Sequence, residues 1–132
     1  MCGIIGITST KNVSSSILNS LRKLEYRGYD SAGIATLESG LIKEVKCEGR
    51  VDVLESNLSK QKLEGNVGIG HVRWATHGVP SAINAHPHSS DKVSVVHNGI
   101  IENSTLLKKL LIKKGHVFKS QTDTEVIVHL IT

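Results

Sequence analysis

The chain has 132 residues, of which 39% are hydrophobic, which suits the core of one ordinary domain and not of two. Its net charge of +4 comes from lysines scattered through helical stretches, and aromatic residues make up only 3%, which argues against a nucleic-acid platform built on base stacking. No apolar run could cross a bilayer and no signal-peptide pattern opens the chain. We therefore expect a cytoplasmic protein that binds neither nucleic acid nor membrane.

The first third of the chain alternates apolar strands with an amphipathic helix. Residues Gly3–Thr8 are rich in isoleucine and predict a buried strand directly after the terminus. Ser14–Ser16 are expected to cap a helix that ends near Gly28. Two strand-like runs, Ala32–Leu37 and Leu41–Cys47, are separated by a short Glu-Ser-Gly step and predict an antiparallel hairpin.

The middle of the chain leads from regular structure into a long polar segment. An amphipathic helix is predicted over Val51–Leu63 and a strand over Val67–Val72. Arg73–Lys92 then shows little periodicity, contains both prolines, and is dense in histidine, asparagine and threonine. Long loops in compact domains are commonly functional, so we expect site residues here.

Regular structure returns in the last third. Val93–Val96 predicts a strand, Asn98–Gly99 a tight step, and a leucine-rich helix follows that Gly115 closes. Thr122 with Glu125 fits a capping box that opens a last helix over 125–131. The sequence stops inside that apolar pattern, which we interpret as truncation. Alternating strands and helices with one antiparallel pair predict a layered α/β or α+β domain.

Cys2 offers a specific chemistry because methionine is readily trimmed when the next side chain is small. The residue then carries both a thiol and an α-amine with a pKa of about 7.7–8.0, so its amine can act as general base for its own thiol. Cys47 is the only other cysteine, too few for a disulfide framework, and free thiols are expected. The alternative interpretation is that Cys2 is an ordinary small apolar residue at a strand start.

Six sequence blocks supply the context that favours chemistry. They are MCGI at 1–4, YRGYDSAG at 26–33, RWATHG at 73–78, NAHPH at 84–88, HNGIIEN at 97–103 and SQTDTE at 120–125. In this order they resemble the glutaminase domain of glutamine:fructose-6-phosphate aminotransferases, also called glucosamine-6-phosphate synthases, within the class II glutamine amidotransferases. The residues of these blocks resemble those of this hexosamine-forming branch more closely than those of the purine-forming enzymes.

The resemblance implies an α+β chain with the four-layer αββα N-terminal-nucleophile fold, here truncated. Residues 1–132 would be the N-terminal part of the glutaminase domain, with the sugar-isomerase domains absent and apolar faces and sheet edges left exposed. The implied activity is hydrolysis of L-glutamine, which supplies ammonia for glucosamine-6-phosphate formation from fructose-6-phosphate. The full-length enzyme would add an isomerase part or a homodimer partner. The alternative is an inactive fragment or a remnant that binds glutamine or a partner.

The resemblance also assigns roles to matching positions. Cys2 would attack the glutamine amide and form a thioester, with the Asn98 side-chain NH₂ and the Gly99 N–H as the oxyanion hole. Arg73 would bind the substrate α-carboxylate and Asp123 its α-ammonium. The pocket wall would comprise Trp74, Thr76 and His77, and the supporting residues would be Arg27, His86 and His97. Plainer alternatives are a hairpin turn for Asn98–Gly99, a helix N-terminal charge for Asp123, and core packing for Trp74.

A metal site is the competing hypothesis for the histidines. Five of the seven lie within 27 positions, and these are His71, His77, His86, His88 and His97. The chain has no His-Glu-x-x-His motif and no paired cysteines, and thioester chemistry needs no metal. We therefore predict neither a metal nor a cofactor.

Overall fold

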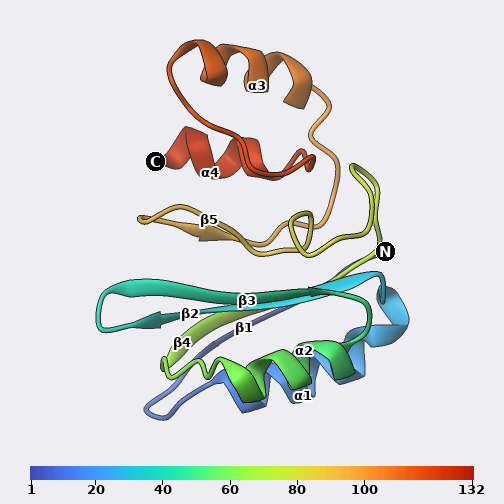
Figure 1. The fold of residues 1–132 in the computed structure, drawn as a ribbon, viewed down its shortest axis with the longest axis vertical. Coiled ribbons are helices and arrows are strands. Elements are labelled where there is room, and N and C mark those ends of the chain that lie inside the picture. Colours follow the sequence, from blue (N-terminus) through green and yellow to red (C-terminus); the bar gives the residue numbers. More distant parts are fainter.

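The computed structural model describes residues 1–132 and contains two antiparallel sheets (Figure 1). The larger sheet has four strands in the spatial order β1-β4-β2-β3. The bounds of these strands are Gly3–Thr8 for β1, Ser31–Glu38 for β2, Leu41–Glu48 for β3 and Val67–Arg73 for β4. The smaller sheet pairs β5 (His88–Ser89) with β6 (Ser94–Val95). The predicted β2–β3 hairpin is confirmed, with its turn at Ser39 and Gly40, both at positive φ.

Helices cover the outer faces of the two sheets. On the larger sheet lie α1 (Ser14–Leu24), which continues into a 3₁₀ turn at Glu25–Arg27, and α2 (Val51–Lys60). Beyond the smaller sheet lie α4 (Glu125–Ile131) and then α3 (Ser104–Lys113), which packs on α4. The result is the predicted α+β arrangement of four layers, helices, sheet, sheet and helices, seen from bottom to top of Figure 1.

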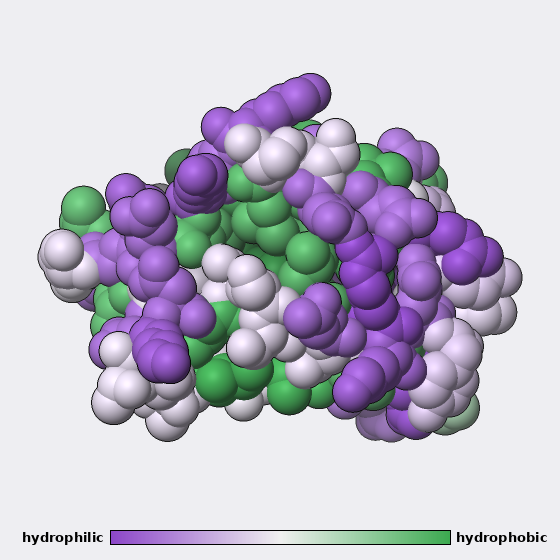
Figure 2. All heavy atoms as spheres, turned by 90° about the horizontal axis from the view of Figure 1, so that it is seen from below, coloured by the Kyte–Doolittle hydropathy of each residue, from purple (hydrophilic) through white to green (hydrophobic).

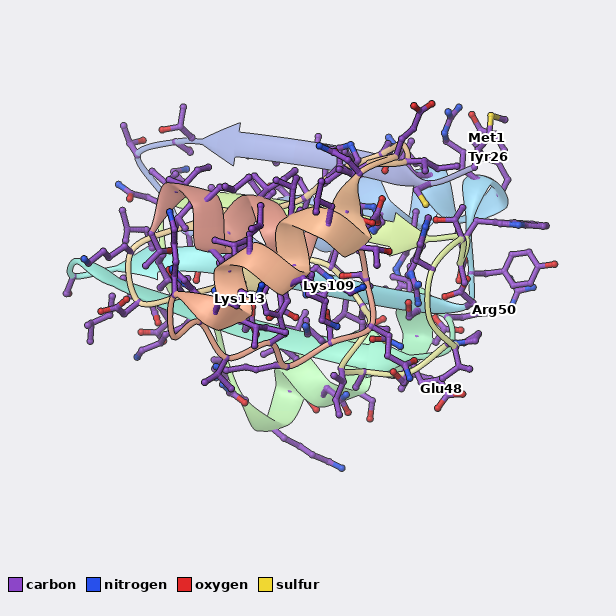
Figure 3. The ribbon with its side chains drawn as sticks, turned by 90° about the horizontal axis from the view of Figure 1, so that it is seen from above. Met1, Tyr26, Glu48, Arg50, Lys109 and Lys113 are labelled. Carbon is purple, nitrogen blue, oxygen red and sulfur yellow. The ribbon has the colours of Figure 1, made fainter.

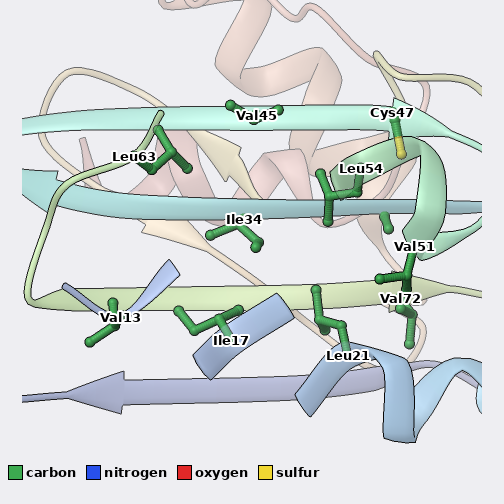
Figure 4. Packing of buried hydrophobic residues seen from close by; sticks show 11 residues of the cluster. Val13, Ile17, Leu21, Ile34, Val45, Cys47, Val51, Leu54, Leu63 and Val72 are labelled. Atoms are coloured by element: carbon green, nitrogen blue, oxygen red, sulfur yellow. The ribbon is translucent and has the colours of Figure 1, made fainter. Parts of the chain in front are cut away.

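The main core lies between the larger sheet and its two helices (Figure 4). Ile17 and Leu21 of α1 and Leu54 of α2 are fully buried against Ile34 and Val72 of the sheet. Full burial of such a side chain contributes about 1.5–3 kcal/mol. Because β4 carries glycines opposite α1, the helix approaches the strand closely. This packing holds β4, which ends at Arg73, against α1.

The predicted helix caps are wrong, because tertiary contacts hold both helix starts. Ser14–Ser16 lie inside α1; Val13 takes the N-cap position, is buried, and donates its N–H to the Gly65 carbonyl at 3.0 Å. Thr122 and Glu125 form no capping box. The Glu125 carboxylate instead accepts the N–H groups of Lys119 and Ser120, which precede Thr122.

Three predicted elements differ in extent or burial. Helix α2 ends at Lys60, three residues before the predicted end, because Leu63 buries its side chain in the core from non-helical backbone. The strand expected at Val93–Val96 is paired only at Ser94–Val95. Strand β1 is an edge strand with one open face, so Ile4 is 40% exposed instead of buried.

Apolar side chains remain exposed at both edges of the larger sheet and on the outer helices. Ile4 lies on edge strand β1 and Leu41 on edge strand β3, and Leu106 and Ile131 are exposed on α3 and α4. From the side of α1 and α2, the surface is a mixture of polar and apolar residues, with an apolar area near its centre and further apolar atoms at its edges (Figure 2). None of the helices has the length and apolarity that a membrane span requires.

Candidate functional site

A cavity of about 410 Å³ opens where the N-terminus, the end of β4, the loop after β6 and the segment before α4 meet. Every residue to which the resemblance assigned a role lies on its wall. These residues are Cys2, Arg27, Arg73, Trp74, Thr76, His77, His86, His97, Asn98, Gly99 and Asp123. The remaining wall residues are Met1, Ile100, Thr122 and Thr124. Residues from both ends of the chain, from Met1 to Thr124, therefore share one site.

Strand pairing places Cys2 beside the end of β4. Gly3 pairs with Val72 in antiparallel register, so the residue before β1 lies beside the residues that follow Val72. The Trp74 N–H accordingly donates to Cys2 Sγ at 3.1 Å. The Cys2 carbonyl accepts two further hydrogen bonds, from Arg27 Nε at 2.9 Å and from Asn98 Nδ2 at 3.1 Å. Both the thiol and the backbone of Cys2 are therefore held in place.

Asn98 and Gly99 lie in the loop between β6 and α3. The Asn98 carboxamide is bound at both ends: its Oδ1 lies 2.9 Å from His71 Nε2, and its Nδ2 donates to the Cys2 carbonyl. Gly99 has φ +141°, a backbone conformation that side chains rarely adopt. Asn98–Gly99 is thus no hairpin turn between paired strands, because the chain continues into α3.

Arg73 is buried at the end of β4. Its guanidinium donates to the carbonyls of Val79 at 3.3 Å and Gly78 at 3.4 Å, and also to that of His77. Burial lowers the pKa of Arg73, whereas the nearby Asp30, Cys2 and Asp123 raise it. Because an arginine remains charged in proteins, a cation faces the cavity. The N–H groups of the guanidinium are hydrogen-bonded to the loop at residues 77–79, which forms the rim of the cavity.

Asp123 contributes a buried carboxylate to the same cavity, 6% exposed, in the segment before α4. Its Oδ2 accepts the Ile101 N–H at 2.7 Å, and its Oδ1 lies 3.9 Å from His77 Nδ1. One cation and one anion thus line a single small cavity, an arrangement that suits a ligand carrying both a carboxylate and an ammonium group.

Trp74 is half exposed at the cavity rim, so the core-packing interpretation of this residue is wrong. Its ring meets the Tyr29 ring edge-on at 5.9 Å, and the Arg50 guanidinium lies 4.6 Å from the centre of the Tyr29 ring. Met1 and Tyr26 are both 76% exposed and lie at this same end of the molecule with Arg50 (Figure 3). The terminus is therefore open to solvent.

Three histidines form a buried row beside the cavity. His71 stacks on His86 with ring centroids 4.1 Å apart, and His86 meets His88 edge-on at 4.7 Å. Burial lowers the pKa of His71 to about 4 and that of His88 to about 3, and burial with its two histidine neighbours lowers the pKa of His86 further. All three are neutral at neutral pH. No group of three or more histidine, cysteine, aspartate or glutamate residues is placed to hold a metal ion.

The segment that carries His86 and leads into β5 at His88 lies tightly on the larger sheet. A Cβ at Gly33 of β2 would lie 2.1 Å from the His86 carbonyl oxygen, so no larger residue fits there without moving the loop. This close approach explains why a glycine stands in the YRGYDSAG block. It also positions the histidine row.

Two residues that contact the site residues were missed at the sequence level. Asp30 Oδ2 accepts the Ala75 N–H at 2.5 Å, and the Asp30 N–H donates to the Arg73 carbonyl, so this residue holds the chain on both sides of Trp74. His71 contacts Asn98 from behind the cavity wall. Its position two residues before Arg73 on one strand, and therefore on the same face, was the available signal.

The four layers and the cysteine held at the start of the first strand define the N-terminal-nucleophile class of fold. A family model described as "Glutamine amidotransferase domain" matches residues 55–132. The chain belongs to this glutamine amidotransferase family.

Curated relatives and solved structures agree with this membership. Proteins named glutamine–fructose-6-phosphate aminotransferase [isomerizing] are 56% identical over 132 residues in Bartonella henselae and 57% identical over 133 residues in Pyrococcus horikoshii, which cover 100% and 99% of this chain. The chain spans 22% of the length of each relative. The solved glutamine phosphoribosylpyrophosphate amidotransferase from B. subtilis superposes with a TM-score of 0.82 at 30% identity, over 99% of this chain and 29% of that one.

Proposed function

We propose that Cys2, once Met1 is removed, hydrolyses the side-chain amide of L-glutamine. The observation that carries this proposal is the shared cavity, in which the Cys2 thiol lies beside Asn98 and Gly99 and with the charged pair Arg73 and Asp123. Family membership supports it. The proposal covers the glutaminase reaction of this part of the protein.

The reaction proceeds through a covalent thioester. The α-amine of Cys2 takes the thiol proton, and Sγ attacks the amide carbon of glutamine to form a C–S bond. The tetrahedral intermediate collapses, the C–N bond breaks, and ammonia leaves with the transferred proton. Water then attacks the thioester carbon, which releases glutamate and restores the thiol.

The developing oxyanion needs hydrogen-bond donors. Asn98 Nδ2 carries two hydrogens, of which one is used on the Cys2 carbonyl and the other is free for the cavity. The Gly99 N–H is the second donor, and its glycine conformation suits this exposed position. Loss of one such donor typically lowers kcat about 10²–10³-fold.

The substrate head group binds between the buried charges. The Arg73 guanidinium pairs with the α-carboxylate and Asp123 with the α-ammonium. Since the guanidinium holds the carbonyls of residues 77–79, carboxylate binding exchanges at least one of those bonds. The cavity wall beside the head group is formed by Trp74, Thr76 and His77. The site is supported by Arg27, His86 and His97.

In the whole protein, the ammonia would aminate a sugar phosphate. The relatives' name supports fructose-6-phosphate as acceptor and glucosamine-6-phosphate as product. In this proposal, residues 1–132 are the N-terminal part of the glutaminase domain, and a sugar-isomerase part or a homodimer partner completes the enzyme in the cytoplasm. No cofactor takes part in the glutaminase step.

The experiment compares glutamate and ammonia release from glutamine by the parent protein, Cys2→Ala and Cys47→Ala. Cys47 is the matched control because it is the other free thiol, buried in β3, where burial raises its pKa. We expect Cys2→Ala to abolish turnover and Cys47→Ala to retain it. Mass spectrometry of the parent should show a chain without Met1. A folded, trimmed parent that binds glutamine without turnover would instead identify a binding remnant.

A further inference from the structure

His71 lies behind the cavity wall and is used by none of the steps above. It is on β4, is completely buried, and does not line the cavity. The one side-chain hydrogen-bond partner of its ring is Asn98, whose Oδ1 lies 2.9 Å from Nε2, and its Nδ1 has no partner. The only side-chain partner of this buried histidine is therefore a residue of the proposed oxyanion hole.

The hydrogen bonds fix the state of both side chains. The Cys2 carbonyl can only accept, so the atom of Asn98 that faces it is the NH₂ group. The atom that faces His71 is then the carboxamide oxygen, so His71 must donate from Nε2. A neutral histidine with its proton on Nε2 leaves Nδ1 as a bare acceptor, in agreement with the unpartnered Nδ1.

Neighbouring rings restrict the orientation of the His71 imidazole. It stacks on His86 at an interplanar angle of 14°, and His86 in turn meets His88, whose Nε2 is hydrogen-bonded to Thr122 Oγ1 at 2.8 Å. The row therefore reaches from Asn98 on one side of the cavity to the residue before Asp123 on the other. Stacking fixes the ring plane, and the ring plane fixes the direction of the Nε2–H.

We propose that His71 is a positioning residue of the glutaminase reaction, which acts by holding the Asn98 carboxamide with its NH₂ toward Cys2 and the cavity. Without this donor, only the hydrogen bond from Nδ2 to the Cys2 carbonyl holds the carboxamide, and rotation by half a turn would present its oxygen to the oxyanion and repel it. The inference rests on the proposed function and extends it to a residue outside the cavity.

The test is a double-mutant cycle with His71→Leu and Asn98→Ala in the protein at its natural length, with kcat and KM measured for glutamine. His71→Leu should lower kcat roughly 10- to 100-fold, less than complete loss of an oxyanion donor, and leave KM nearly unchanged. In the Asn98→Ala background the same change should lower kcat by no more than about twofold, because the group on which His71 acts is gone. His71→Gln, whose amide can donate to Asn98 Oδ1, should restore much of kcat.

A second readout separates positioning from general damage. Alkylation of Cys2 by iodoacetamide passes through no oxyanion, so its rate should be similar in the parent and in His71→Leu. Equal losses of kcat in both Asn98 backgrounds, or no loss in either, would overturn this inference alone. If the parent shows no Cys2-dependent turnover, the proposed function fails and the inference with it. Should His71→Leu not fold, His71→Asn, which is too short to reach Asn98, takes its place.

Discussion

The two buried charges of this site, Asp123 and Arg73, differ in how many of their hydrogen-bonding groups already have a partner within the protein. The Asp123 carboxylate uses one oxygen on the Ile101 N–H, and its other oxygen, 3.9 Å from His77, is too far for a hydrogen bond to that ring. Arg73, in contrast, is engaged with three carbonyls. Asp123 thus has an oxygen that can accept a hydrogen bond from a ligand without losing one. Arg73 must give up at least one hydrogen bond to a carbonyl before it can bind a ligand.

Asp123→Asn tests this difference. The asparagine oxygen can still accept the Ile101 N–H, so the fold is retained and only the negative charge is lost. Under the proposed function, the KM for glutamine should rise roughly 10- to 100-fold, since a hydrogen bond to a charged group contributes about 1.5–3 kcal/mol. Steady-state kinetics and a thermal melt measure the two effects. An unchanged KM would show that Asp123 does not bind the ammonium group.

The sequence predicted the residues that face the cavity better than those behind it. Cys2, Asn98 and Arg73 stand in recognisable blocks, and all lie on the cavity wall. His71 and Asp30 were missed because they bind Asn98 and Ala75 across 27 and 45 positions of sequence, and no local pattern contains that pairing. For Trp74, the sequence left a place in the pocket wall and a place in the core as alternatives, because the exposure of a side chain depends on tertiary packing.

Between elements, α1 packs closely on β4. A Cβ at Gly70 would lie 2.5 Å from Ile17 Cγ2, a side chain that is itself fully buried in the core. The positions of the four strands of the larger sheet and of its hairpin were predicted closely because alternation and turn residues act locally. The helix starts were not, since a backbone carbonyl at Gly65 and the Glu125 carboxylate replaced the expected caps.

Gly70→Ala should therefore destabilise the fold. We expect the free energy of unfolding to fall by about 1–3 kcal/mol, because Ile17 has no space into which it can move. Gly6→Ala is the matched control: it lies on neighbouring strand β1, where the nearest atom to a new Cβ is 3.9 Å away. It should change stability by less than about 0.5 kcal/mol. Equal effects of the two variants in urea unfolding would contradict the close-packing argument.

At the scale of the whole molecule, the histidine row couples folding to pH. The ordinary histidine pKa is 6.5, whereas His71 titrates at about 4 and His88 at about 3 when folded. At a pH between the unfolded and folded pKa values, these histidines are protonated in the unfolded chain and neutral in the folded one. Their burial therefore costs no stability above pH 6.5, and the free energy of unfolding decreases as the pH falls below that value. The slope is about 1.4 kcal/mol per pH unit for each such histidine.

Denaturant unfolding at pH 7.5 and pH 5 measures this loss. The range from pH 5 to pH 7.5 lies above the ordinary pKa of Glu125. Burial raises the pKa of this carboxyl, but hydrogen bonds from Ser120, His129 and Lys119 together lower it by more. Glu125 therefore stays ionised over this range and does not contribute to the loss of stability. His88→Gln removes one titrating group and should reduce the slope by about one histidine's share. Equal stability of the parent protein at both pH values would show that the row is not buried as described.

The two hydrogen bonds to the Cys2 carbonyl also bear on how the protein matures. Arg27 and Asn98 both grip the chain on the C-terminal side of the Met1–Cys2 bond, while Met1 itself is open to solvent. Cleavage of that bond removes neither anchor. Under the proposed function, the chain that still carries Met1 is a proenzyme whose site is already assembled, and activation requires the cut of one peptide bond without refolding.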